Sequence, residues 1–179
     1  MAINWIDKHR RRIAKISVTA SAVRNQVPKG SARGIRRFLK TIDLREYRAA
    51  SERRFRVLLD RDTKRLQSRL RPKDIPWGTA RKQLNIFLRN VAYNHYLRRH
   101  YRFRTVVRWL EVPLDSYVGR GLAGEPENQT RTTPLRWKTI KSLSPKSSAQ
   151  FQELARRVAR RMGTRPVHLD VLYFRAEQE

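Results

Sequence analysis

The sequence contains no cysteine, which excludes disulfides, thiolate zinc sites and cysteine-ligated iron–sulfur clusters. Its four histidines are scattered along the chain without the spacing of metal ligands. They are His9, His95, His100 and His168. We therefore expect no metal, no nucleotide and no other organic cofactor.

Long apolar runs are also missing. No stretch approaches the ~20 residues that a membrane-spanning helix needs, and charged residues interrupt every apolar cluster near the N-terminus, so no signal-peptide core is present. We expect a protein that has no membrane partner and is located in the cytoplasm, associated with the nucleoid if the source is bacterial.

Acidic residues are few. Fifteen Asp and Glu stand against forty-two Lys and Arg, which gives a formal net charge of +27. Two stretches, Lys8–Ile42 and Ile75–Leu110, contain no acid and carry eleven and eight cations. A surface this cationic repels itself unless a polyanion neutralises it, and guanidinium groups suit phosphate. The charge predicts nucleic acid as the partner, with duplex DNA as the expected form; an unusually basic surface without such a partner is the alternative.

Apolar residues recur at helical spacing through most of the chain, and no strand-like alternation or internal repeat is present. Caps and breakers predict helices over 3–25, 31–42, 43–70 and 79–99, with a stop at Arg71-Pro72. Another helix is expected after Pro113, capped by Asp115 or Ser116. A further helix is expected from the cap Ser144, with Pro145 at its first position, to Met162, where Gly163 ends it, and a last one from Thr164 onward. The expected fold is all-α, a two-lobed bundle of seven to eight helices. We expect a monomer with one domain over 1–179, in which 1–70 forms a basic lobe and 71–179 carries the hairpin and the site.

The stretch 75–120 organises the predicted site. It opens with IPWGTARK, in which Gly78 is expected to be left-handed and Thr79 to cap the next helix. On that helix the apolar stripe through Leu84 and Leu88 should be buried, which places Lys82 on the opposite, outward face. Asp115 ends the long acid-free region at the start of another helix.

Lys82 and Asp115 together suggest base-excision chemistry. A neutral lysine amine can attack the sugar C1′ and form an imine, while a nearby carboxylate stabilises the cationic sugar or accepts a proton. The alternative from spacing alone is that Lys82 is one surface cation among forty-two and that Asp115 is a helix cap.

These motifs resemble the helix-hairpin-helix DNA glycosylase superfamily, whose members carry a Leu-Pro-Gly-type hairpin, a lysine in the following helix and a catalytic aspartate. The matching positions are Ile75, Pro76, Gly78, Lys82, Val112, Asp115, Ser116, Tyr117 and Val118, with Trp77 in the place of the first hairpin glycine. The wide gap between lysine and aspartate is most similar to the archaeal 8-oxoguanine glycosylase branch. The end of the chain resembles an uncharacterised bacterial family.

The resemblance implies a cleft between two helical lobes, a hairpin backbone that grips a phosphate, and a target base flipped into the cleft. It assigns Lys82 as the nucleophile and Asp115 as its electrostatic or acid–base partner. The expected function is a DNA base-excision glycosylase, with or without AP-lyase activity. The alternative is a non-catalytic basic helical protein that binds DNA or RNA, or a subunit of a nucleoprotein assembly.

Further residues are expected to contact nucleic acid. They are Trp77, Gly78, Thr79, Arg81, Arg89, Arg98, Arg99, Arg102, Lys8, Arg10, Arg11 and Arg12. The run Lys8–Arg12 fits either a phosphate-binding face or a solvated one. Trp77 could wedge beside a base step or cover the core, and of the two roles the core one is expected. Aromatic residues interleave the connector arginines and could stack bases or fill the core. They are Tyr93, Tyr96, Tyr101, Phe103 and Trp109. His168, two residues before Asp170, is expected to be a hydrogen-bonded structural histidine.

Overall fold

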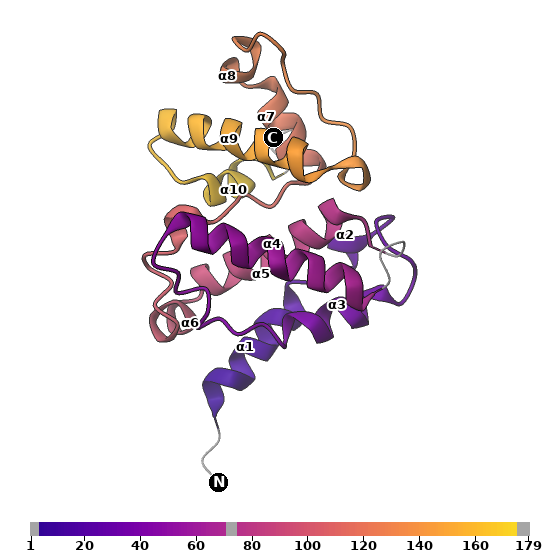
Figure 1. Ribbon diagram of the computed structural model, residues 1–179, viewed down its shortest axis with the longest axis vertical. Coiled ribbons are helices and arrows are strands. Elements are labelled where there is room, and N and C mark those ends of the chain that lie inside the picture. The colour runs from indigo at the N-terminus through magenta and orange to yellow at the C-terminus, as the bar shows by residue number, and fades with distance from the viewer. Residues whose placement is uncertain (1–3, 71–74, 175–179) are drawn as a thin grey trace.

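A computed structural model describes residues 4–70 and 75–174. Over these residues the chain is all-helical, with ten α-helices, three 3-10 helices and no strand. The all-α class is confirmed, and the expected seven to eight helices were close to the observed number. Figure 1 shows the helices in two layers, with α7 to α10 above and α1 to α6 below.

The lower layer holds six helices. They are α1 (Trp5–Ile16), α2 (Ala20–Val23), α3 (Ser31–Leu39), α4 (Glu52–Arg69), α5 (Trp77–Tyr93) and α6 (His95–His100). The helix predicted over 3–25 is divided, because Thr19 is extended and its hydroxyl accepts a hydrogen bond from the Ala22 amide, which starts α2. The helix predicted from Asp43 begins at Glu52, where Ser51 provides the cap. The predicted stop at 71–72 lies outside the described residues.

The upper layer follows a short connector. Its elements are η1 (Val107–Trp109), α7 (Ser116–Gly124), α8 (Pro126–Gln129), η2 (Ile140–Ser142), α9 (Pro145–Arg161), η3 (Pro166–His168) and α10 (Leu169–Tyr173). Three local predictions are confirmed. Asp115 caps α7, and Ser144 caps α9, which has Pro145 at its first position. After α9, Gly163 takes a left-handed conformation with a φ of +63° that terminates the helix.

Two hydrophobic clusters form the core. The larger draws on residues between Ile13 and Leu110 together with Val167, and the smaller on residues between Val112 and Leu169. Along the chain they therefore meet at 110–112, whereas the expected lobe boundary was at residue 70. Helix α5 contacts α1, α3 and α4, which contribute to the larger cluster, and η2 and α9, which contribute to the smaller one, so it connects the two clusters.

Candidate functional site

Helix α5 carries the predicted lysine and is buried on more than one face. It runs antiparallel to α4. Just before α5, the carbonyl oxygen of Ile75 accepts a hydrogen bond from Gln67, whereas Arg81, further along α5, donates to the earlier α4 residues Thr63 and Asp60. Every α5 residue from 78 to 85 is buried. The helical pattern predicted one buried stripe, but η2 and α9 also pack against α5, and the carbonyl oxygen of Ala22 in α2 meets Lys82 and Gln83. Polar residues of α5 outside the apolar stripe are therefore enclosed as well.

Lys82 is only 3 % exposed, so its predicted outward position is wrong. Its Nζ donates a hydrogen bond to the carbonyl oxygen of Ala22 at 2.7 Å, and the side chain of Gln83 donates to the same oxygen at 2.9 Å. Burial lowers the pKa of Lys82 to about 8, against the opposing charge of Asp115. This is a lysine with an appreciable neutral fraction near physiological pH.

Asp115 lies close enough to Lys82 for its negative charge to raise the pKa of the amine, but the two side chains do not contact each other. Its Oδ1 accepts hydrogen bonds from the amides of Tyr117 and Val118 at 3.0 and 3.1 Å, so it caps α7 as the structural alternative predicted. Across residues 4–70 and 75–174, no hydrogen bond or ion pair joins Asp115 to Lys82. Asp115 also opposes the lowering of the pKa of Arg89 by burial. The carboxylate is therefore an electrostatic neighbour of Lys82 and Arg89.

The space beside Lys82 does not hold a base. A small cavity there is too narrow to admit a water molecule. Its lining residues are Gly78, Arg81, Lys82, Asn85, Leu114, Leu143, Ser148 and Gln152. Asp115 is not among them, so the amine and the carboxylate do not share an open cleft in this structure.

The predicted hairpin residues lie inside the start of α5. Gly78 is helical rather than left-handed, and a Cβ there would lie 2.3 Å from the carbonyl oxygen of Ile140, so close packing explains the glycine. Thr79 is fully buried and does not cap the helix, which begins after Pro76 without a side-chain cap. Trp77 packs against the smaller cluster, and the guanidinium carbon of Arg81 lies 5.4 Å from the centroid of its ring in a cation–π contact. Trp77 therefore covers the core, as expected of it, whereas the predicted left-handed conformation of Gly78 and cap of Thr79 are wrong.

Arg81 belongs to a buried polar network rather than to a phosphate contact. Its Nε and Nη2 donate to the two carboxylate oxygens of Glu111 at 2.8 and 2.9 Å, and its Nη1 donates to Asp60 at 2.7 Å. Asn85 donates to Glu111 at 3.0 Å. Burial raises the pKa of Glu111, but the charge and hydrogen bonds of Arg81 outweigh it and hold that pKa below its usual value. This network fixes α5 to α4 and to the connector.

The other predicted cations divide into paired and free groups. Arg89 pairs with Asp170, and beside it His168 accepts or donates a 2.7 Å hydrogen bond with the Tyr93 hydroxyl, as expected of a structural histidine. Arg10 is buried, where it bonds to Asp7 and to the carbonyl oxygens of 40 and 42, and Arg11 pairs with Asp7. Of the predicted contact residues, Lys8, Arg12, Arg98, Arg99 and Arg102 are exposed and make no ion pair among the described residues.

The connector aromatics are mostly core residues. Tyr101 and Phe103 are buried, and Trp109 packs partly buried against Phe55. Tyr93 is 44 % exposed but stacks on His168. Tyr96 remains the most exposed of the five.

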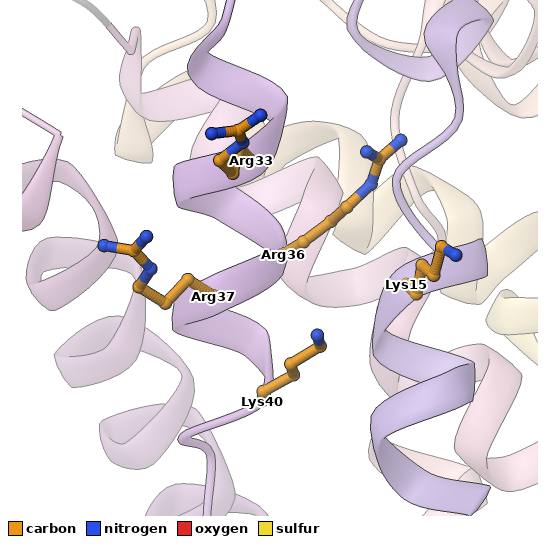
Figure 2. A pocket seen from close by; sticks show the side chains of 5 residues that line it. All are labelled: Lys15, Arg33, Arg36, Arg37 and Lys40. Carbon is orange, nitrogen blue, oxygen red and sulfur yellow. The ribbon is translucent and has the colours of Figure 1, made fainter.

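Five cations that were not singled out from the sequence line one hollow beside α1 and α3. Lys15 comes from α1, Arg33, Arg36 and Arg37 come from α3, and Lys40 caps the C-terminal end of α3 (Figure 2). They line a hollow of about 280 Å³, and no carboxylate is among the described residues around it. Arg36 reaches across toward α1 and donates to the carbonyl oxygen of Val18 at 2.7 Å. We call these five residues the basic face.

The sequence held a signal for the basic face. The acid-free stretch Lys8–Ile42 covers both helices, and the three α3 cations and Lys40 at its C-terminal cap recur at spacings of three and four residues, which places them along one side. What the pattern did not provide is that α1 and α3 pack together and so bring Lys15 opposite them.

Comparison with known proteins gave no match: no family model, no curated protein and no solved structure matches this chain. In the part of the chain that the structure describes, no helix is both long and apolar enough to cross a membrane. The same residues contain no cluster of three or more His, Asp or Glu side chains that could hold a metal ion.

Proposed function

We propose that the protein binds nucleic acid through the basic face, as a non-catalytic helical module. The observation that carries the proposal is the gathering of five cationic side chains around one hollow with no carboxylate among the lining residues. Like charges held this close repel one another, and a polyanion that neutralises them releases its own condensed counterions on binding.

The basic face differs from the parts of α4 and α9 where the protein supplies its own counterions. On α4, Arg56 pairs with Glu52 and Arg61 with Glu46, and on α9, Arg156 pairs with Glu153. By contrast, none of the five residues of the basic face makes an ion pair within the described ranges. These five unpaired cations lie around one hollow, so an external anion can contact several of them at once.

A charge-removal experiment tests this proposal. We expect the triple variant Arg33→Gln/Arg37→Gln/Lys40→Gln to bind a DNA oligonucleotide at least tenfold more weakly than wild type at moderate salt. If all three side chains contact phosphates, the plot of log binding constant against log salt concentration should become less steep by about 2–3, because each lost contact contributes about 0.7–0.9 to the magnitude of the slope. Fluorescence anisotropy between low and moderate salt measures both quantities. Arg36 is left intact because it supports Val18.

The matched control removes the same charge from the other layer. Lys141, Lys146 and Arg160 are exposed and make no ion pair among the described residues. Their triple replacement by glutamine should change affinity less than threefold. Equal losses in both triples would mean that net charge, rather than the basic face, determines binding, and absence of salt-dependent binding in wild type would overturn the proposal.

Base excision at Lys82 is a second candidate, favoured by one observation: the pKa of this amine lies at about 8, within the field of Asp115. A neutral amine is the form that attacks C1′. In the structure the amine is closed in against Ala22, so reaction requires α2 to separate from α5. The chemistry would therefore depend on an opening step before the base enters.

Borohydride trapping on abasic duplex DNA tests that candidate. We expect a covalent adduct with wild type that Lys82→Gln abolishes without weakening DNA binding. Asp115→Asn should reduce the adduct yield while keeping the fold, because asparagine also caps helices well. If wild type gives no adduct between pH 7 and 9, base excision by this lysine is excluded and the binding proposal is unaffected.

A further inference from the structure

Four aromatic rings gather on the surface where α1 meets α6. Trp5 and His9 come from α1, and His95 and Tyr96 come from α6. Trp5 is 53 % exposed and Tyr96 is 58 % exposed, although both are large apolar rings. We call these four residues the aromatic patch.

The rings of the aromatic patch hold one another in place. The Trp5 and Tyr96 ring centroids are 5.4 Å apart in an edge-to-face arrangement, and His95 meets Tyr96 in the same way at 5.5 Å. His9 lies 6.5 Å from both Trp5 and Tyr96. Edge-to-face contacts leave ring faces uncovered, and fixed rings lose little conformational entropy when a ligand stacks on them.

Both helix ends that present the rings are anchored. The side chain of Asn4 accepts a hydrogen bond from the Asp7 amide at the start of α1, and that of Asn94 accepts one from the Leu97 amide at the start of α6, each at 3.1 Å. Helices α1 and α6 also pack against each other. The exposed rings are therefore part of ordered structure.

Cations without ion pairs surround the aromatic patch. At about 100° per residue, Arg12 returns to within roughly 20° of Trp5 on α1, and Lys8 lies one turn from Trp5. Arg99 follows Tyr96 by three residues on α6, again on the same side. All three side chains are exposed and make no ion pair in residues 4–70 and 75–174. Lys15 continues the charge along α1 to the basic face.

We propose that the aromatic patch stacks unpaired bases, so that the preferred ligand is single-stranded nucleic acid or a duplex with an unpaired segment. The inference rests on the proposed nucleic-acid binding. Aromatic rings flanked by Lys and Arg are the physical requirement for binding single strands, because every base has a π-face and the cations follow the backbone. A continuous duplex hides its base faces by stacking, so it can use the basic face but not the aromatic patch.

The test compares a single-stranded oligothymidylate with a duplex of equal length. We expect Trp5→Leu to weaken single-strand binding about tenfold, the effect of losing one stacked base, and to change duplex binding less than twofold. Trp5→Phe should restore most of the single-strand affinity because it restores an aromatic face. Tyr96→Leu should reproduce the loss. The control is Tyr117→Leu, a 40 % exposed tyrosine in the other layer, which should change neither ligand's affinity.

The outcomes separate this inference from the proposed function. If the charge triple abolishes salt-dependent binding but Trp5→Leu and Tyr96→Leu have no effect, the aromatic patch does not bind bases and the basic face stands. Equal losses on single strand and duplex would also overturn base stacking. If wild type binds neither ligand, nucleic-acid binding itself fails. Circular dichroism melting of each variant verifies that it is folded, and two independent ring variants keep the test decisive.

Discussion

Glu111→Ala is expected to lower the free energy of unfolding by about 3–5 kcal/mol, because it removes one partner of a buried ion pair and leaves the other charge enclosed. The guanidinium of Arg81 is 7 % exposed and makes two hydrogen bonds with Glu111, whose side chain is 13 % exposed. Asn85 also loses its acceptor. Urea or guanidinium denaturation followed by circular dichroism at pH 7 measures the change.

The other carboxylate on the same guanidinium is the matched control. Asp60 contacts Arg81 at 2.7 Å but is 59 % exposed, so water screens the pair and Asp60→Ala should cost less than about 1 kcal/mol. Similar losses for the two variants would show that burial does not decide the strength of these pairs.

The destabilisation caused by Glu111→Ala should also depend on pH. The pKa of Glu111 is held below its usual 4.5, so its stabilisation is fully present above that value and is lost as the pH falls through the lower, folded-state pKa. The difference in the free energy of unfolding between wild type and Glu111→Ala should therefore be constant near neutral pH and should decrease only in acid.

Local signals in the sequence predicted local structure well. Ser144 followed by Pro145, Asp115 before an apolar run, and Gly163 after the last apolar residue of a helix each satisfy backbone groups within one turn, so their effect does not depend on the rest of the fold. Thr19 and Ser51 are equally local caps, yet the apolar periodicity continued past both and masked them.

The candidate site depended on distant contacts, which a single sequence does not display. Arg81 and Glu111 are 30 residues apart, and Lys82 meets a carbonyl oxygen 60 residues away at Ala22. A helical wheel distinguishes an apolar face from a polar one, but it does not show that a second layer will cover the polar face. For the same reason the acid-free stretches predicted a basic surface, whereas the meeting of Lys15 with the α3 cations required the packing of α1 on α3.

Lys82→Met is expected to stabilise the protein at pH 7 by about 3 kcal/mol. The folded-state pKa of about 8 lies below the usual 10.5, and each pH unit between the two values corresponds to about 1.4 kcal/mol. At pH 7 the amine is mainly charged in both the folded and the unfolded states, so the fold bears nearly the full cost of the buried charge. Methionine fills a similar volume without that charge, and the carbonyl oxygen of Ala22 keeps the donor of Gln83 at 2.9 Å.

The gain should disappear as the pH rises. Between about pH 8 and 10.5 the folded protein releases the Lys82 proton while the unfolded chain retains it, so wild-type stability increases with pH and approaches that of the variant. Denaturation curves of both proteins from pH 7 to 10 measure this convergence of the two stabilities. The control is Lys64→Met, at an exposed position of α4, which should change stability by less than about 0.5 kcal/mol throughout.

A Lys82→Met variant less stable than wild type at pH 7 would mean that the hydrogen bond to Ala22 outweighs the burial of charge and that the lysine is a structural residue. A stabilised variant would instead identify a cation that opposes folding, which is the property that a nucleophilic amine at this position requires.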